Sequence, residues 1–233
     1  MKTFLRNNGL CFCFLFLFIA AMAGQIIFGF EEHNKELIEE GSKAIYLSSY
    51  LTSGHFIQAT FENWESEFLQ MALFVILTIF LMQKGSSESK DLNKDEEVVR
   101  EPDGMRKGAP WPVKKGGVIL AFYKYSLTIA LLSLFIVSFV VHFYGSLRDE
   151  NEQLLLKGKH LESVSDYMGD SRFWFESFQN WQSEFLSVFA IVMLSIIYVK
   201  LVLHSRNQLM HPTVKPENKK ECTIQLFNKL VIV

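Results

Sequence analysis

Four apolar blocks alternate with polar segments along the chain. They cover residues 9–30, 68–82, 125–144 and 185–199, and nearly all charged residues lie between them. A helix needs about 20 apolar residues to cross the hydrocarbon core of a bilayer. The pattern therefore predicts an all-α membrane protein with four transmembrane helices.

The second and fourth blocks are too short to cross a bilayer by themselves. Each spans 15 residues, and such a helix rises about 22 Å against roughly 30 Å of hydrocarbon. We expect these two helices to begin near Asn63 and Asn180. The predicted organisation is a first two-helix repeat at 1–83 with spans at about 9–30 and 64–83, a cytoplasmic linker at 84–116, a second two-helix repeat at 117–205 with spans at about 122–145 and 181–203, and a cytoplasmic tail at 206–233.

The two halves of the chain resemble each other. A shift of 117 positions aligns residues 9–83 with 126–200 without a gap, and about 21 of these 75 positions are identical. The longest match is F-x-N-W-x-S-E-F-L, which begins at Phe61 in the first half and at Phe178 in the second. We predict that the chain is two parallel copies of one helix, outer-segment, helix unit.

Basic residues are concentrated in alternate segments. Residues 84–116 carry eight Lys and Arg, whereas 31–67 carry two against eight acidic residues and 147–184 carry four against eight. Because basic loops stay on the cytoplasmic side, both termini and the linker are predicted to be cytoplasmic.

Each of the two outward-facing acidic segments is about 37 residues long and is expected to contain a short amphipathic helix. Residues 31–41 and 149–158 either extend the first and third helices or form separate short helices.

The first block also has features of a cleaved signal peptide. Lys2 and Arg6 precede the apolar run, and residues 21–23 read Ala-Met-Ala, a pattern typical of a cleavage site. However, the apolar residues continue to Phe30, which is long enough for a span, and the matching segment of the second half lies in mid-chain. We therefore expect the first helix to be retained.

The repeated motif places polar residues at the outer membrane boundary. On a helix, its aromatic residues share one face and its Asn, Ser and Glu share another. A carboxylate near hydrocarbon usually faces a bundle interior or a wet cavity. Two interpretations stay open: a structural role within the bundle, or a site across a pseudo-two-fold axis for a cation, a proton or a small polar ligand. The candidate polar site comprises Asn63, Ser66, Glu67, Asn180, Ser183 and Glu184, with Gln25 and His142 from the first and third helices, and the candidate interfacial anchors are Trp64, Trp181, Phe61 and Phe178.

Catalytic and metal-binding motifs are not found in the sequence. The histidines lack a spacing such as His-x-x-x-His, the three Cys are not spaced as metal ligands, and there is no nucleophile elbow, P-loop or dinucleotide fingerprint. We therefore predict no enzyme activity, no metal site and no cofactor. A net charge of −2 without a sustained basic stripe argues against nucleic acid as a partner.

Long aromatic motifs carry a family resemblance. The runs YLTSGHF at 50–56, FENWESEFLQM at 61–71 and SRFWFESFQNWQSEFL at 171–186 resemble a family of uncharacterised bacterial multi-pass membrane proteins, defined only as a domain of unknown function. The resemblance covers residues 5 to about 205. It implies a location in the bacterial plasma (inner) membrane and brings no activity, ligand or site.

The sequence as a whole favours an integral membrane protein with a non-enzymatic structural or interaction role. The alternative is binding or passage of a small ion, proton or polar ligand through the outward-facing site. The predicted partners are the lipid bilayer and further copies of the chain, and the sequence identifies no other protein partner.

Overall fold

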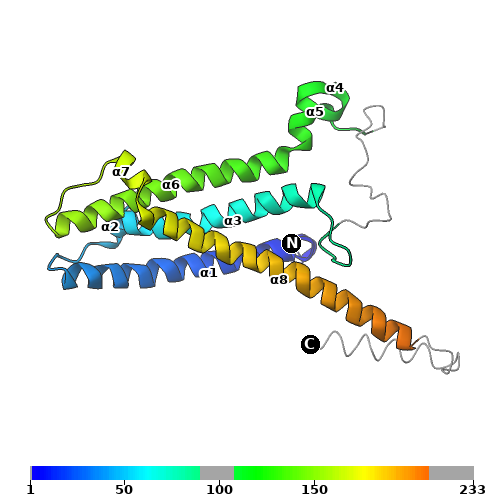
Figure 1. Ribbon diagram of the computed structural model, residues 1–233, viewed down its shortest axis with the longest axis horizontal. Helices are drawn as coiled ribbons and strands as arrows, with labels where there is room; N and C mark the ends of the chain where they lie inside the picture. Colours follow the sequence, from blue (N-terminus) through cyan, green and yellow to red (C-terminus); the bar gives the residue numbers. More distant parts are fainter. Residues whose placement is uncertain (1, 90–107, 210–233) are drawn as a thin grey trace. The chain divides into compact units, whose positions relative to one another are not determined.

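The computed structural model of this chain describes residues 2–89 and 108–209 (Figure 1). Within these ranges every regular element is a helix. The predicted linker residues 90–107 and tail residues 210–233 lie outside the described residues. The helices are α1 (Lys2–Glu39), α2 (Leu47–Tyr50), α3 (Gly54–Phe80), α4 (Trp111–Lys115), α5 (Gly117–Lys124), α6 (Ser126–Leu156), α7 (Val164–Met168) and α8 (Ser171–Leu209).

Three helices in the described part of the chain are long and apolar enough to cross a membrane. They are Arg6–Glu39 in α1, Ser126–Leu156 in α6 and Ser171–Val202 in α8. Helix α3 is not among them, because its first half carries the acidic residues of the repeated motif and the helix ends at Phe80. The described part of the chain is therefore all-helical, with three helices suited to a membrane.

The long helices extend beyond the predicted spans. Helix α1 continues to Glu39 and α6 to Leu156, so the polar residues that follow the apolar blocks extend these helices. Helices α3 and α8 begin at Gly54 and Ser171, well before the repeated motif. A non-helical residue, Tyr125, separates α5 from α6, so the start of the predicted span at 122–145 lies in α5.

Helices are found in parts of the segments that were predicted to be the linker and the tail. Helix α4 lies within the predicted linker and contains Pro112 in its first turn. Proline is tolerated there because the first N–H groups of a helix have no partner within it. Helix α8 also continues to Leu209, into the predicted tail.

Helices α1 and α6 end in the same way. After α1, Gly41 has a φ of +82° and the N–H of Ser42 donates to the carbonyl of Leu37. After α6, Gly158 has a φ of +64°, and the next N–H donates to the matching leucine, Leu154. A left-handed glycine with this bond satisfies the last carbonyls of a helix and reverses the chain.

Beyond each of these turns, the chain is held by an asparagine. Asn34 exchanges two hydrogen bonds with the backbone of Ile45, and Asn151 exchanges two with the backbone of Glu162. The one-turn helices α2 and α7 follow, and each presents a buried tyrosine, Tyr50 or Tyr167. The outer segments are therefore ordered by local bonds that recur 117 residues apart.

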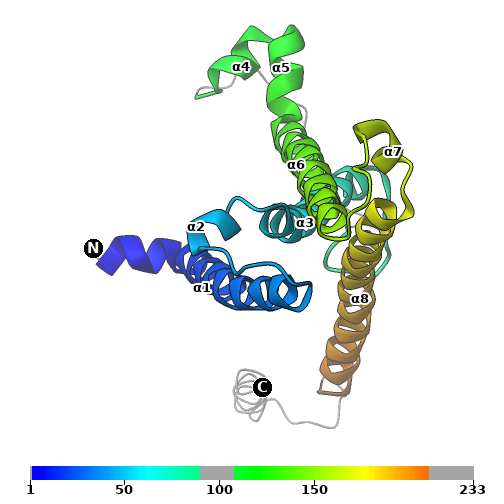
Figure 2. The same cartoon turned by 90° about the vertical axis from the view of Figure 1, so that its left-hand side faces the viewer.

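Helices α3 and α6 lie side by side (Figures 1 and 2), and two glycines mark their contact. A Cβ on Gly54 would overlap the backbone of Asp149, and one on Gly145 would lie 2.6 Å from the backbone nitrogen of Gln58. The two backbones can approach this closely only because neither glycine carries a side chain. This contact brings the polar residues of the two helices together.

The chain divides into two compact units. The first contains Met1–Leu73 and Gly104–Phe185, and the second contains Phe74–Asp103 and Leu186–Val233. Within the second unit, the hydroxyls of Ser86 and Ser195 lie 2.8 Å apart. All residues of the site described next belong to the first unit.

Candidate functional site

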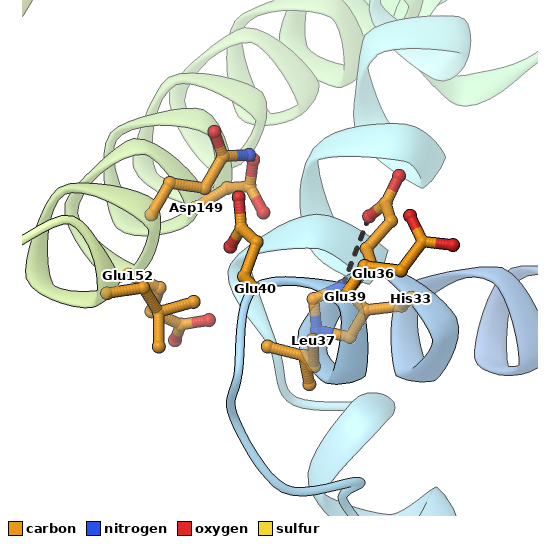
Figure 3. Close-up of a pocket in the computed structure, with 9 residues that line it drawn as sticks. His33, Glu36, Leu37, Glu39, Glu40, Asp149 and Glu152 are labelled. Atoms are coloured by element: carbon orange, nitrogen blue, oxygen red, sulfur yellow. Dashed lines mark hydrogen bonds and ion pairs between the residues drawn. The ribbon is translucent and has the colours of Figure 1, made fainter.

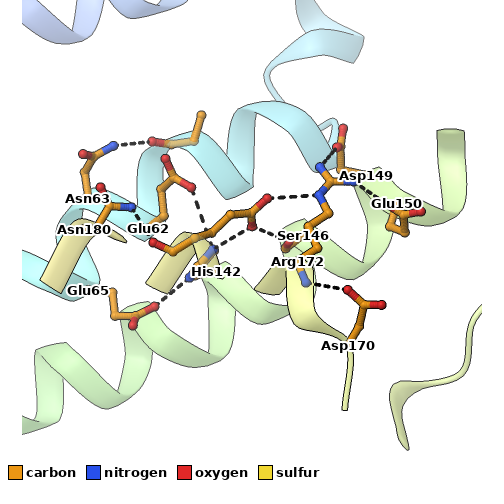
Figure 4. A network of polar contacts seen from close by, with 12 residues as sticks. Glu62, Asn63, Glu65, His142, Ser146, Asp149, Glu150, Asp170, Arg172 and Asn180 are labelled. Carbon is orange, nitrogen blue, oxygen red and sulfur yellow. Dashed lines mark hydrogen bonds and ion pairs between the residues drawn. The ribbon is translucent and has the colours of Figure 1, made fainter. Parts of the chain in front are cut away.

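A fully buried histidine is at the centre of a polar cluster in the first unit (Figure 4). His142 lies in α6, and its Nδ1 is 2.6 Å from Oε2 of Glu65 in α3, which is also fully buried. The other oxygen of Glu65 accepts a hydrogen bond from the indole N–H of Trp181 at 2.9 Å. Because a carboxylate accepts hydrogen bonds, this arrangement favours the tautomer with the proton on Nδ1 and leaves Nε2 as a donor of electrons.

The second nitrogen of His142 faces two other carboxylates. Nε2 is buried without a hydrogen-bond partner in the described structure, and it lies 3.7 Å from Oε2 of Glu176 and 4.0 Å from Oε2 of Glu62. These separations are too long for hydrogen bonds. One atom from each of the three side chains lies within 4.8 Å of the others, which is close enough to surround a single ion.

The carboxylate of Glu176 accepts hydrogen bonds at both of its oxygens. Oε1 accepts a hydrogen bond from Nε of Arg172 at 3.0 Å, and Oε2 accepts one from the hydroxyl of Ser146 at 3.0 Å. The hydroxyl of Tyr167 lies 2.5 Å from that of Ser146. The hydroxyl of Ser146 has a single proton, which it uses to donate a hydrogen bond to Glu176. In the bond between the two hydroxyls, Tyr167 is therefore the donor and Ser146 the acceptor. Burial raises the pKa of Tyr167 to about 12, so this phenol stays protonated at neutral pH.

Arg172 joins α8 to α6. Its guanidinium donates to Asp149 at 2.8 Å and to Glu150, in addition to Glu176. Among the described residues, the cluster around His142 and Arg172 thus contains five carboxylates and one guanidinium: Glu62, Glu65, Asp149, Glu150, Glu176 and Arg172. Even with His142 protonated, negative charge is in excess.

Two acidic cavities adjoin this cluster. One, of about 310 Å³, is lined by residues that include Glu62, Asp149 and Arg172, so it reaches the cluster directly. The other, of about 260 Å³, lies between α1 and α6 (Figure 3); its carboxylates are Glu36, Glu39, Glu40, Asp149 and Glu152.

A second histidine group stands between the cavities. The rings of His33 and His55 stack with centroids 4.7 Å apart, and Glu36 lies 3.9 Å from Nδ1 of His33. These three side chains also offer atoms close enough together for one ion. The sequence predicted no metal site, because each of the two groups brings together residues from more than one helix and no local spacing connects its members.

Comparison with family models identifies the family. Residues 1–201 match the model described as "Domain of unknown function (DUF6766)". The chain belongs to this family. Neither the curated proteins nor the solved structures contain a match to it. Because the DUF6766 description carries no activity, the function must be argued from the geometry of the site.

The residues predicted for the site of this DUF6766 chain are only partly brought together. His142 is at the centre of the cluster. Gln25, at the matching place in the first half, donates to the hydroxyl of Thr60 at 3.1 Å. Glu67 lies within electrostatic range of Glu184, and the backbone carbonyl of Glu184 accepts a hydrogen bond from Gln70.

The remaining predicted polar residues bond locally or face outward. The side chains of Asn63 and Asn180 donate to carbonyls four residues earlier in their own helices, and buried Ser66 donates to the carbonyl of Asn63. Ser183 is exposed. These residues therefore do not form part of the His142 cluster.

The four aromatic residues predicted as anchors form two pairs of contacting rings, one tilted and one edge-to-face. Phe61 packs on Trp64 and Phe178 on Trp181, with ring centroids 5.0 and 5.2 Å apart. Trp181 has an additional role, since its indole N–H is bonded to Glu65. A role of these rings at the membrane boundary stays a prediction.

Sequence reasoning in this DUF6766 chain missed the carboxylates around His142. It selected residues that the two halves share, whereas the cluster uses positions at which the halves differ. Glu62 and Glu65 match Gln179 and Gln182, and Glu176 matches Ala59. The available signal was a charge present in one copy and absent from the other.

Proposed function

We propose that this chain is a four-span membrane protein that binds small cations at the polar cluster and acidic cavities of its first unit. The observation that carries the proposal is the excess of carboxylates over basic groups in a cluster where Glu65 and Asp149 are buried and the other three carboxylates are partly buried. Removing an unpaired carboxylate from water costs several kcal/mol, and a proton or a bound cation offsets that cost. The acidic cavities attract cations towards the cluster.

The membrane topology is part of the proposal. Helix α3 would be the fourth span, supported by the apolar residues that follow its acidic first half. The distribution of Lys and Arg supports cytoplasmic termini, and the family resemblance supports the bacterial plasma membrane. The matching turns after α1 and α6, and the matching bonds of Asn34 and Asn151, support a duplicated two-helix unit.

The site proposed here differs from a symmetric site built on the repeated motif. It uses Glu62 and Glu65 of α3, His142 of α6 and Glu176 of α8, which are not equivalent by the 117-residue shift. Such a site needs no catalytic group, and we propose that the chain is not an enzyme.

A structural or interaction role is the second candidate. It is favoured by Arg172 of α8, which is bonded to Asp149 and Glu150 of α6 and to Glu176 of its own helix. In that case the cluster holds the bundle together, and the function resides in contacts with lipid, with further copies of the chain or with a protein partner. The two candidates differ in whether cations bind.

The test is thermal unfolding of the purified full chain in detergent, followed by tryptophan fluorescence. We expect Ca²⁺ to raise the unfolding temperature at constant ionic strength, because a ligand of the folded state stabilises it by RT ln(1 + [L]/Kd). Changing Glu36 and Glu152 together to Gln should weaken the apparent affinity about 3- to 10-fold, since both side chains line the acidic cavity and their charges attract cations.

The matched control is Glu32→Gln, which removes an exposed charge on the same helix as Glu36 and should leave the affinity unchanged. A Ca²⁺ response that is absent, or equal in the cavity variant and the control, would refute cation binding and favour the structural role.

A further inference from the structure

We propose that Glu62, His142 and Glu176 together bind one divalent first-row transition-metal ion, with Zn²⁺ as its representative, and that Glu65 is the positioning residue for His142. This inference rests on the proposed cation binding, and it names the class of ion and the atoms that hold it. The ligand atoms would be Nε2 of His142 and one carboxylate oxygen from each glutamate.

The spacing of the three atoms suits such an ion. Zinc binds imidazole nitrogen and carboxylate oxygen at about 2.0 to 2.2 Å, which places tetrahedral ligands about 3.4 Å from one another. Nε2 lies 3.7 and 4.0 Å from the two oxygens. These two distances exceed the tetrahedral separation by only a few tenths of an ångström, and the two oxygens lie within 4.8 Å of each other. Each donor comes from a different helix.

The orphaned nitrogen of His142 is the independent sign that a ligand belongs here. The side chain is fully buried, and Nε2 has no hydrogen-bond partner in the described structure although it points between two carboxylates. A buried polar atom without a partner has lost its hydrogen bonds to water and gained none in return, which destabilises the folded state. A metal bound at Nε2 would satisfy this atom and neutralise the two carboxylates together.

The surroundings of the three ligands match those of metal sites. A histidine ligand usually gives its other N–H to a carboxylate that fixes the ring. Glu65 is the carboxylate bonded to Nδ1 of His142, and the indole N–H of Trp181 holds Glu65 by a second hydrogen bond. Arg172 holds the far oxygen of Glu176, and Ser146 donates to the oxygen that faces His142.

The donor set selects the class of metal. Ca²⁺ prefers six to eight oxygen ligands and Mg²⁺ keeps several waters, whereas imidazole suits Zn, Fe, Ni and Cu. Three protein ligands leave one coordination position for water or exchange. Glu62 lines the 310 Å³ cavity, so this cavity gives the ion a path to the site.

The competing state is an imidazolium without metal. A doubly protonated His142 would be attracted to Glu65 on one side and to Glu176 on the other. It would leave Nε2 too far from either Glu62 or Glu176 for a hydrogen bond. The two states differ in one measurable property: only the neutral ring binds metal.

The experiment measures Zn²⁺ on the full chain, purified in detergent with an affinity tag free of histidine and stripped with a chelator. Zinc per chain is determined by elemental analysis, and its affinity by competition with a chromophoric chelator. We expect about one tightly bound Zn²⁺ per chain. His142→Gln, which installs the residue found at Gln25 of the first half, should weaken binding at least 100-fold.

Two further variants keep the test decisive. Glu62→Gln conserves volume at the cavity edge and should weaken Zn²⁺ binding at least 10-fold, which settles the matter if His142→Gln does not fold. Glu65→Gln should weaken Zn²⁺ binding about 10- to 100-fold and reduce the Ca²⁺ stabilisation far less, because for Ca²⁺ it removes only one of several attracting charges. A purely structural role of Glu65 would affect both ions equally.

The control is His55→Gln, in the second histidine group, which should change the affinity less than 2-fold. The inference is overturned if Zn²⁺ does not bind, if it stays bound in His142→Gln or Glu62→Gln, or if His55→Gln removes it. Should Ca²⁺ still stabilise the wild type in those cases, cation binding by the acidic cavities stands and only the transition-metal site fails. Loss of both responses refutes both proposals.

Discussion

The two halves of the chain share a frame and differ in their chemistry. Both have a left-handed glycine after the first long helix, an asparagine that braces the turn, and a buried tyrosine on a one-turn helix. Yet Gln25 donates to Thr60 within the first half, whereas His142, at the matching position, meets Glu65 of the other half. Shared residues build the frame, and residues that differ build the site.

The tyrosine pair shows how one position changes the network. Tyr50 packs against Gly29, where a Cβ would overlap its hydroxyl. In the second half the residue that matches Gly29 is Ser146. Its hydroxyl accepts a hydrogen bond from the hydroxyl of Tyr167 and donates one to Glu176. One added hydroxyl therefore connects the frame of the second half to the cluster.

The largest expected effect comes from the contact between α3 and α6. Gly145→Ala places a Cβ 2.6 Å from the backbone nitrogen of Gln58, which cannot move away as a side chain could. We expect a loss of about 2 to 3 kcal/mol in the free energy of unfolding, measured by denaturation in mixed detergent micelles. Gly24→Ala, which meets nothing within 4 Å, is the control. Equal stability of the two variants would show that α3 and α6 do not pack this closely.

A smaller effect is expected at the link between α6 and α8. Arg172→Gln removes the cation shared by Asp149, Glu150 and Glu176. Leaving carboxylates unpaired in a buried place costs about 3 to 5 kcal/mol, and we expect about 2 kcal/mol here because the Arg172 side chain is 30% exposed. Arg148→Gln, at an exposed pair, should cost about 0.5 kcal/mol. Similar losses in both variants would contradict a special role of Arg172.

The pH dependence of Tyr167 gives the third prediction. Burial raises its pKa to about 12 from an ordinary value of 10.0, so the folded state favours the neutral phenol. Its contribution is fully present below pH 10 and is lost as the pH rises to about 12; two pKa units correspond to about 2.7 kcal/mol. The unfolding temperature of the wild type should fall more steeply above pH 10 than that of Tyr167→Phe. Parallel curves would refute the prediction.

Much of the frame could be predicted from the sequence. The apolar blocks predicted long helices and their order, because such patterns are local and periodic; the sidedness inferred from the basic residues stays a prediction. The extension of α1 and α6 was one of two stated alternatives. The exact starts of α3 and α8 were not predicted, because polar residues before the repeated motif continue a helix as readily as they end one.

The site could be predicted only at His142. Glu65 lies 77 residues before His142 and Glu176 lies 34 residues after it, so no local spacing connects them. Their contact depends on Gly54 and Gly145, which let α3 and α6 approach. A search for charges present in only one half would have found all three carboxylates around the ring.

The most direct test of the account is the X-ray absorption spectrum of the zinc-loaded full chain at the zinc edge. Bond lengths and ring scattering in this spectrum count the imidazoles around the metal. The account predicts one imidazole and two or three oxygen ligands at about 2.0 to 2.2 Å, which corresponds to His142 with Glu62 and Glu176. Two imidazoles would place the metal at His33 and His55 instead, and none would contradict a site built on His142.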